Sequence, residues 1–157
     1  MRVTAKVDYA VRASVELARA LGDDDGRATR VKGHDIATAQ GIPPKFLENI
    51  LGDLKRSGLI GSVRGADGGY WLSRQPDEVT VADIIRAVEG PLADVRGEPP
   101  EELTYAADLD SLQRVWIALR SNLRAVLEHV TLADIVAGRL DPDVDRLADT
   151  ADAWERR

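Results

Sequence analysis

The chain has 157 residues, 44% of them hydrophobic and 31% charged, a composition typical of one globular domain with or without an extension. No run approaches the roughly 20 apolar residues that span a bilayer, and the N-terminus lacks the apolar core of a signal peptide, so we expect a cytoplasmic protein. The chain has no cysteine and two histidines, which excludes disulfides and thiolate metal sites, and no nucleophile–base pair indicates an enzyme.

The net charge of −6 is unevenly distributed. Residues 1–76 carry 12 lysines and arginines against 9 acidic residues, whereas residues 77–157 carry 9 against 18. DNA binding needs a locally basic face rather than a basic chain, so the acidic total does not exclude it. The basic excess of the first half is small and carries little weight by itself.

Three helices are predicted in the first part of the chain. Residues 5–21 place apolar side chains at helical spacing, after Thr4 as an N-cap and before Gly22 as a stop. A short helix is expected over 33–40 and a longer one over about 44–57. The longer helix has one apolar stripe at i, i+3, i+4 and i+7, so its opposite face is expected to be exposed.

Two short strands, 59–63 and 70–73, are predicted after these helices. The intervening segment RGADGG contains Asp67 and Gly68, a strong signal for a β-hairpin. A phosphate-binding loop would instead need a different glycine pattern, or a lysine ahead of a helix, and this stretch has neither. We therefore expect a hairpin with Arg64 at the base of its tip.

A long helix is predicted over 109–130, after a short helix over about 81–89 and a Pro-, Gly- and Glu-rich linker or exposed loop over 91–104. Its apolar residues alternate spacings of three and four, the seam of a coiled coil. The helix packs either on its own domain or against a second copy, and we favour dimerisation because the small N-terminal part offers little surface to cover it. The seam residues assigned to dimerisation are Leu112, Trp116, Leu119, Leu123 and Val126.

These elements predict a mainly α fold with a small β-hairpin, a winged helix-turn-helix plus a long C-terminal dimerisation helix. The expected parts are the winged helix-turn-helix over 1–78, a connecting helix and loop over 79–108, the dimerisation helix with a short helix over 109–140, and an acidic tail over 141–157. We expect the tail to be partly helical and poorly anchored, with Trp154 able to dock.

A winged helix-turn-helix places its second helix in the major groove of DNA. On the exposed face of this helix, Asn49 can bond adenine through two hydrogen bonds, and Lys45 can reach guanine or phosphate. Phe46 lies off the apolar stripe and either touches a thymine methyl group or caps the core. Arg64 on a rigid wing can enter the narrow minor groove of A·T-rich DNA, and the alternative is a solvated hairpin arginine.

Three stretches resemble the Rrf2 family of bacterial transcription regulators, and the resemblance covers roughly residues 1–140. They are MRVTAKVDYAVRA, IATAQGIPPKFLENILGDLKRSGLIGSVRGADGGYWLSR and VTVADIIRAVEG, and a looser match extends to VTLADIVAGRL. The resemblance implies a homodimer that binds palindromic promoter DNA, with Arg64 as the minor-groove arginine, and we expect it to act as a repressor. The candidate DNA-contacting residues are Arg2, Lys6, Lys45, Phe46, Glu48, Asn49 and Arg64.

The chain departs from this family at its iron–sulfur cluster. Many members hold the cluster with cysteines in the loop where this chain has PLADVRGEPPEELTYAADL, without cysteine. Asp8 lies where one redox-sensing branch has an acidic ligand, but it cannot hold a cluster without thiolates, and we expect a surface salt bridge there. His34 and His129 are interpreted as ordinary surface or helix-end histidines, so no metal and no cofactor are predicted.

The cluster-free branch that represses cysteine metabolism is the part of the family that the chain resembles most. That resemblance implies a partner enzyme, a cysteine synthase, while a small-molecule effector at the 91–108 loop is the alternative. The competing function is a protein–protein interaction module whose winged helix no longer binds DNA, which the acidic second half permits. A DNA-binding assay titrated with salt separates the two functions.

Overall fold

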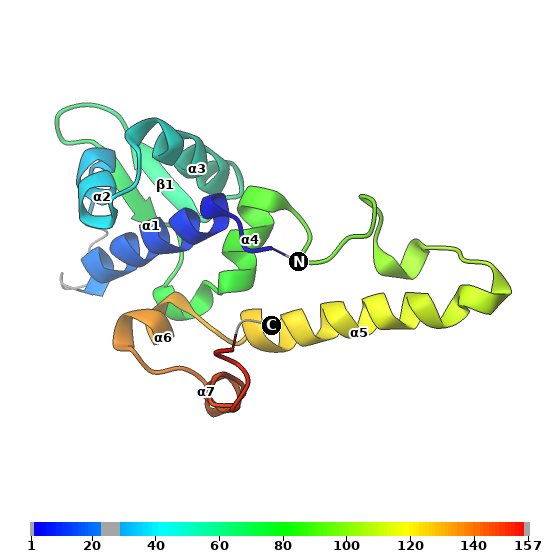
Figure 1. The fold of residues 1–157 in the computed structure, drawn as a ribbon. Coiled ribbons are helices and arrows are strands. Elements are labelled where there is room, and N and C mark those ends of the chain that lie inside the picture. The colour runs from blue at the N-terminus through cyan, green and yellow to red at the C-terminus, as the bar shows by residue number, and fades with distance from the viewer. Residues whose placement is uncertain (1, 23–28, 156–157) are drawn as a thin grey trace.

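The computed structural model describes residues 2–22 and 29–155, and it is mostly helical with one hairpin (Figure 1). Its main elements are α1 (Ala5–Gly22), α2 (Gly33–Gln40), α3 (Pro44–Arg56), β1 (Ile60–Val63), β2 (Gly69–Leu72), α4 (Val81–Glu89), α5 (Asp110–Leu127), α6 (Leu132–Ala137) and α7 (Pro142–Ala148). The first three helices and the hairpin cluster together, and α5 extends away from them as an arm. The predicted fold class, a mainly α winged helix-turn-helix, is confirmed.

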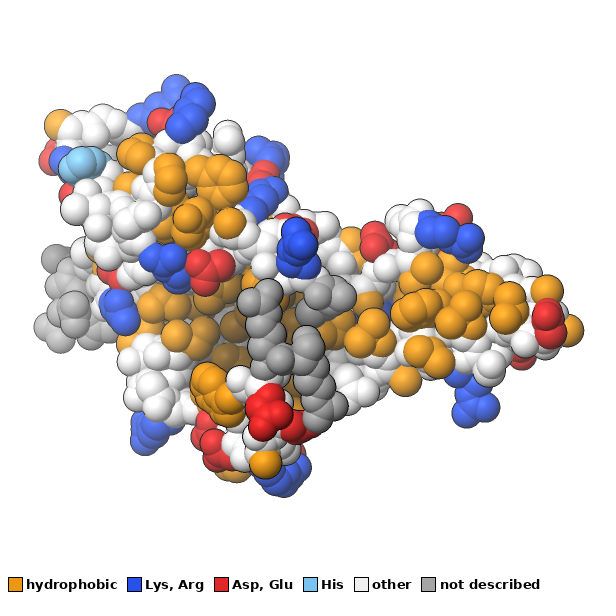
Figure 2. Space-filling model, in the orientation of Figure 1, with side chains coloured by type: hydrophobic (Ala, Val, Ile, Leu, Met, Phe, Trp, Pro, Cys, Tyr) orange, Lys and Arg blue, Asp and Glu red, His pale blue; other side chains and the backbone are white. Residues whose placement is uncertain are grey.

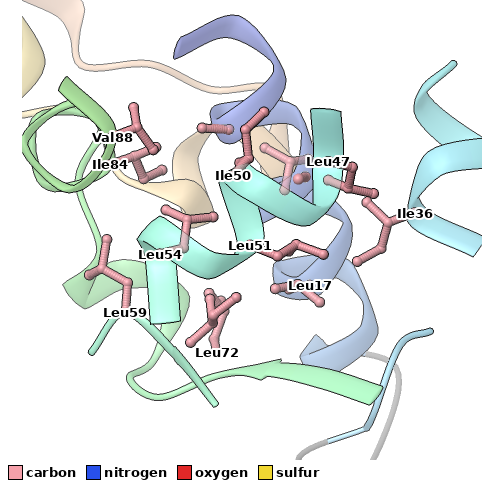
Figure 3. Close-up of a cluster of buried hydrophobic side chains, with 14 of the residues drawn as sticks. Leu17, Ile36, Leu47, Ile50, Leu51, Leu54, Leu59, Leu72, Ile84 and Val88 are labelled. Atoms are coloured by element: carbon pink, nitrogen blue, oxygen red, sulfur yellow. The ribbon is translucent and has the colours of Figure 1, made fainter. Parts of the chain in front are cut away.

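The core of the winged helix is formed by the apolar stripe of α3. Leu47, Ile50, Leu51 and Leu54 are all buried, and Figure 3 shows them among side chains from several other elements, including Leu17 of α1. Burying each such side chain contributes about 1.5–3 kcal/mol, so the stripe fixes which face of α3 points inward. The opposite face of α3 is thereby turned to solvent.

A tight turn sets α3 against α2. Gly41 has φ 61°, a left-handed conformation that favours glycine. The N–H of Ile42 donates to the carbonyl of Ala37 at 2.9 Å, and the Ile42 side chain is buried. Pro44 occupies the first turn of α3, where its missing N–H is no loss.

The wing is an antiparallel hairpin in which Ile60 pairs with Leu72 and Val63 pairs with Gly69. The predicted hairpin is confirmed, and the chain reverses over residues 64–68, within the predicted segment RGADGG. The N–H of Gly68 donates to the carbonyl of Gly65 at 3.0 Å. A Cβ atom at Gly68 would lie 2.5 Å from the carbonyl oxygen of Val63, so only glycine fits there.

The segment that precedes α2 forms hydrogen bonds and a ring contact with the wing. Val31 and Tyr70 exchange two backbone hydrogen bonds, of 2.9 and 2.8 Å. The Arg30 guanidinium lies 5.6 Å from the centre of the Trp71 ring and also donates to the carbonyl of Asp67 at 3.1 Å. These contacts order the tip of the hairpin relative to α2.

Two capping boxes start α4 and α6 side by side. Thr80 and Asp83 bond each other's backbone N–H groups at 3.1 Å, and Thr131 and Asp134 do the same at the start of α6. The two N-cap threonines also form a β-bridge. The two helices therefore begin next to each other, beside the core. Leu132 at the start of α6 contributes a fully buried side chain to this core.

The segment expected as a linker or exposed loop over 91–104 is irregular and mostly exposed, and three of its side chains are buried. Leu92, Pro100 and Leu103 are buried. The Gln113 side chain on α5 donates to the carbonyls of Pro100 and Leu103, at 3.1 and 2.9 Å. The prediction of an exposed loop therefore holds for most of the segment, but it missed the three buried side chains because irregular backbone buries them without any periodic pattern.

The long helix is shorter than the predicted 109–130. It ends at Leu127, and Val130 leaves the helix to accept a backbone hydrogen bond from Val81 at 2.9 Å. No residue of α5 is fully buried. Within the described part of the chain, no helix combines the length and the apolar character needed to cross a membrane.

The tail contains α7, as its predicted partial helicity implied, but the docking of Trp154 is wrong. The Trp154 side chain is 85% exposed. Its indole N–H donates to the carbonyl of Ala148 at 2.7 Å, a local contact within the tail. The indole group is satisfied by this short-range bond rather than by burial against the core.

Candidate nucleic-acid interface

The outward face of α3 presents four predicted residues together, Lys45, Phe46, Glu48 and Asn49. All four are exposed, because the helical period turns them away from the buried stripe. The Lys45 ammonium lies 3.5 Å from a carboxylate oxygen of Glu48, with both side chains mostly in solvent. Such an exposed pair contributes little to stability, so Lys45 is free to reorient toward another anion.

Phe46 combines the two alternatives that the sequence left open. Its ring meets the ring of Tyr9 on α1 edge to face, with the centroids 5.7 Å apart. The side chain nevertheless stays 39% exposed. Phe46 therefore packs on the edge of the core and also keeps apolar surface on the outward face of α3.

A hollow of about 410 Å³ separates α3 from the wing. Arg64, Lys55 and Lys32 line it together with Glu48, so three cations face one carboxylate. Arg64 follows β1 directly and is exposed, and its guanidinium has no ion pair with any residue that the structure describes. The arrangement is a basic recess beside the exposed face of α3. Figure 2 shows lysine and arginine side chains at the upper edge of the molecule, in the region of α3.

Lys32 and Lys55 were missed as candidates by sequence reasoning. Lys55 lies seven residues after Glu48, two helical turns along the same face, and that spacing could have found it. Lys32 immediately precedes α2 as its N-cap residue. Its nearness to Arg64 depends on how the wing folds back, which no local pattern indicates.

Lys6 and Arg2, the other two predicted DNA-contacting residues, lie outside the surface formed by α3 and the wing. The Lys6 ammonium is 2.7 Å from Asp53 and donates to the carbonyl of Val88 at 2.6 Å, so it ties α1 to α3 and α4. Arg2 is exposed and lines a separate groove beside α4. The structure thus brings the four α3 residues and Arg64 around one surface, and it gives Lys6 an internal partner.

The expected surface salt bridge of Asp8 is present. A carboxylate oxygen of Asp8 lies 3.1 Å from the guanidinium of Arg12, one turn further along α1. His34 and His129 are both exposed, as interpreted from the sequence.

A groove of about 530 Å³ lies between α5, the start of α1, α4 and the 91–96 loop. Three seam residues, Trp116, Leu119 and Leu123, line it. Away from the seam, Val115 and Ile117 are 55% and 39% exposed. Apolar side chains gather along the α5 arm in Figure 2, a larger run than isolated surface residues would give.

The fold and this surface define a class of protein. A helix-turn-helix with an exposed polar second helix, flanked by a wing that carries an arginine, is the architecture of a winged-helix DNA-binding protein. Residues 3–138 match the model of the Rrf2 family, described as iron-dependent transcriptional regulators. The chain belongs to the Rrf2 family, whose members regulate transcription and are not enzymes.

Relatives and solved structures agree with this assignment. The chain is 46% identical over 155 residues to a Mycobacterium tuberculosis protein named as HTH-type transcriptional regulator Rv1287, covering 99% of this chain and 93% of that one. It is 33% identical to the HTH-type transcriptional regulator CymR of Bacillus subtilis, over 87% of this chain and 91% of CymR. The structure of CymR, the global cysteine regulator of that organism, superposes with a TM-score of 0.71 at 30% identity, over 88% and 98% of the two chains. IscR of T. potens superposes with a TM-score of 0.66 at 30% identity, over 100% and 93%.

The iron in the family description does not fit the donor groups of this chain. Iron–sulfur clusters are held mainly by cysteine thiolates, and the sequence has no cysteine. Across residues 2–22 and 29–155, no three histidine, aspartate or glutamate side chains gather in a way that could hold a metal ion. No step of the function is therefore assigned to iron.

Proposed function

We propose that the protein is a homodimeric, sequence-specific repressor that binds palindromic promoter DNA without an iron–sulfur cluster. The observation that carries the proposal is the exposed face of α3 beside the basic recess that contains Arg64. A repressor of this kind acts where the bacterial chromosome lies, so we place it in the cytoplasm.

The candidate residues fall into three groups according to the kind of DNA contact that we propose for each. Asn49 and Lys45 are placed to read base edges in the major groove, with Phe46 offering apolar surface to a thymine methyl group and Glu48 limiting which bases are accepted. Arg64 is assigned to the minor groove. Lys32 and Lys55 add phosphate contacts that position the helix without reading sequence.

Dimerisation is assigned to α5 through Leu112, Trp116, Leu119, Leu123 and Val126. In support, none of the 18 residues of α5 is fully buried, and a groove of about 530 Å³ runs beside the seam. A second copy would fill this groove with apolar side chains. Two recognition helices in a symmetric dimer would read half-sites about 34 Å apart, or a multiple of one DNA turn.

The relationship to CymR supports a role in cysteine metabolism. That relative's structure is titled as the global cysteine regulator of its organism. We propose that this chain controls genes of the same kind, and that a partner enzyme such as a cysteine synthase, or a small-molecule effector at the 91–108 loop, adjusts its affinity for DNA.

The proposal is tested by selecting bound DNA from a random pool with the full chain, with and without cell extract. We expect an enriched palindrome with two equal half-sites, and a log–log salt dependence that reports several phosphate contacts. The double variant Asn49→Ala/Arg64→Ala serves as the control that should lose the enrichment. If the wild-type chain enriches no sequence with or without extract, the proposal is overturned in favour of the protein-interaction module.

A further inference from the structure

A second, smaller cavity adjoins the apolar groove and shares residues 91–94 of the loop with it. Its volume is about 180 Å³, and it is enclosed by the C-terminal part of α4, this loop and α5. Three arginines line it, Arg86 from α4 and Arg120 and Arg124 from α5. We call these three residues the arginine pocket. Pro91, Leu92 and Pro99 provide apolar walls, and Asp94 is the carboxylate among the lining residues.

The three guanidiniums are only partly satisfied. Arg120 pairs with Glu101 at the exposed rim, although its own side chain is just 15% exposed. Arg86 pairs with Glu128 and lies 3.8 Å from a carboxylate oxygen of Asp83. The Nε atom of Arg124 lies 3.8 Å from the Glu128 carboxylate, too far for a hydrogen bond. A guanidinium has five N–H donors, so the pocket holds many more donors than these acceptors can use.

Arg120 lines the cavity, and most of its donors have no acceptor among the described residues. Among the described residues, no buried side-chain nitrogen lacks a hydrogen-bond partner. The single side-chain bond of Arg120, from one terminal nitrogen to Glu101, leaves its other two nitrogens open to solvent. An almost buried guanidinium with open donors, joined by two further arginines, is a geometry suited to an oxyanion.

We propose that the arginine pocket binds a small metabolite through a tetrahedral oxyanion, a phosphate or a sulfate group. Planar guanidiniums bond such groups through paired N–H donors, which lysines cannot match. The volume corresponds to about six water molecules at roughly 30 Å³ each. The site therefore accepts an oxyanion with a few further atoms and is too small for a nucleotide.

Such a ligand would connect the two halves of the molecule. Arg86 belongs to α4, whose Ile84 and Val88 are buried in the winged-helix core. Arg120 and Arg124 belong to α5, the proposed dimerisation helix. An oxyanion shared by these arginines competes with Glu128 for Arg86 and shifts α4 relative to α5, which changes the separation of the two winged helices in a dimer. This consequence rests on the proposed function, whereas binding of the oxyanion does not.

Binding is tested on the full chain with inorganic phosphate and inorganic sulfate as separate probes, at ionic strength held constant with sodium chloride. We expect saturable binding of one ion per chain by calorimetry, and a rise in Tm of about 3–6 °C at tenfold the Kd. The stronger of the two probes indicates whether the metabolite carries phosphate or sulfate.

Two variants on the same helix separate the pocket from general salt effects. Arg124→Gln should weaken binding at least tenfold, and Arg114→Gln, the same charge change at an exposed position outside the pocket, should leave it unchanged. Non-saturable stabilisation that is equal in both variants would reflect the general exclusion of these ions from protein surfaces, and it would overturn the proposal. Failure of both ions to bind the wild-type chain would overturn it as well.

The regulatory step has its own measurement. Affinity for the selected operator, measured by fluorescence anisotropy, should change at least threefold in saturating oxyanion for the wild type and for Arg114→Gln, but not for Arg124→Gln. Unchanged affinity in all three proteins overturns the regulatory step. Saturable, Arg124-dependent oxyanion binding in a protein that binds no DNA supports the pocket and overturns the proposed function instead.

Discussion

Lys6 and Arg64 are both cations in the basic first half of the chain, but their surroundings suit them to different roles. Lys6 is held between Asp53 and the carbonyl of Val88, at 2.7 and 2.6 Å, so moving it to DNA would cost both contacts. Arg64 is exposed at the start of the wing loop and lines the basic recess. A free guanidinium costs little to transfer to a ligand, which makes Arg64 the better candidate for a DNA contact.

Replacing Arg64 by Ala should weaken operator binding mostly at sites with A·T-rich flanks, because those flanks narrow the minor groove. The log–log salt dependence should decrease by about one per subunit. Folding should be unaffected, since Gly65 and Gly68 still shape the turn. Binding to operators with A·T→G·C flanks measures the effect, with Arg74→Ala, an exposed arginine beyond the hairpin, as the control. Equal losses on every flank would mean that Arg64 contacts only the backbone.

Replacing Asn49 and replacing Lys55 should weaken DNA binding in different ways. Asn49→Ala should relax base preference at one position in each half-site, at a cost of about 1–3 kcal/mol if the contact uses two hydrogen bonds. Lys55→Ala should weaken binding about equally for all sequences and lower the salt dependence by about one per subunit. Titrations against a set of single-base operator variants distinguish the two patterns. A sequence-dependent loss for Lys55→Ala would show that it reads bases.

At the scale of elements, the capping boxes explain why α4 and α6 begin where they do. The Thr131 hydroxyl donates to the Asp134 carboxylate at 2.6 Å, and the Thr131 backbone N–H donates to it at 2.8 Å. These two bonds, the hydroxyl's first, hold the pKa of Asp134 below its ordinary value. The ionised carboxylate is therefore favoured by folding, and its contribution to stability is present above the ordinary aspartate pKa.

This lowered pKa predicts that the start of α6 contributes to the free energy of unfolding in a way that is lost in acid. Thr131→Ala should lower the free energy of unfolding by about 1 kcal/mol at pH 7, the usual cost of a lost N-cap. The difference from the wild type should shrink as the pH falls below about 4, because protonation of Asp134 removes the advantage of the bond from the Thr131 hydroxyl to the carboxylate, whereas the N-cap bond that the hydroxyl accepts from the Asp134 N–H remains. Urea unfolding at several pH values measures this, with Thr104→Ala, an exposed threonine, as the control. A difference that stays constant down to pH 3 would contradict the linkage.

At the scale of the whole molecule, α5 is an arm that the preceding 91–104 segment covers only in part. Figure 1 shows it running away from the winged helix, and none of its side chains is fully buried. Apolar surface left in water along a helix of 18 residues is costly, and a second copy offers matching surface. This exposed surface is the reason why we propose dimerisation through α5 rather than packing on its own domain alone, the alternative that the seam pattern left open.

Leu119→Asp should convert the dimer to a monomer, because an unpaired carboxylate in the seam costs several kcal/mol when desolvated. Val136→Asp on α6 is a matched control, since Val136 is 40% exposed and Leu119 is 41% exposed. Sedimentation velocity at micromolar concentration compares the three proteins. A Leu119→Asp protein that remains dimeric would remove α5 from the interface.

The purified protein should be colourless and should stay so after anaerobic incubation with iron and sulfide. The physical reason is the donor set, because no thiolate exists to ligate a cluster. Absorption spectra together with iron and sulfide analysis check this, and a visible band with stoichiometric iron and sulfide would contradict it. A cysteine-containing member of the family provides the positive control for the reconstitution.

The sequence by itself determined the elements and the face that α3 exposes. The spacing of Leu47, Ile50 and Leu54 identifies the buried side of α3, and glycines mark the ends of the helices and the reversal of the wing. These signals are local, since a period or a cap is complete within a few residues. The winged helix-turn-helix and the outward position of Asn49 could therefore be predicted without coordinates.

Only the tertiary structure decided which distant residues meet. Lys6 reaches Asp53, Lys32 and Lys55 face Arg64, and the 91–99 loop folds between Arg86 and α5. These contacts depend on the path of irregular segments and on the length of long side chains. Neither of these produces a periodic pattern in the sequence. A helical pattern specifies one face of one element, whereas a site between elements exists only after packing has fixed their relative positions.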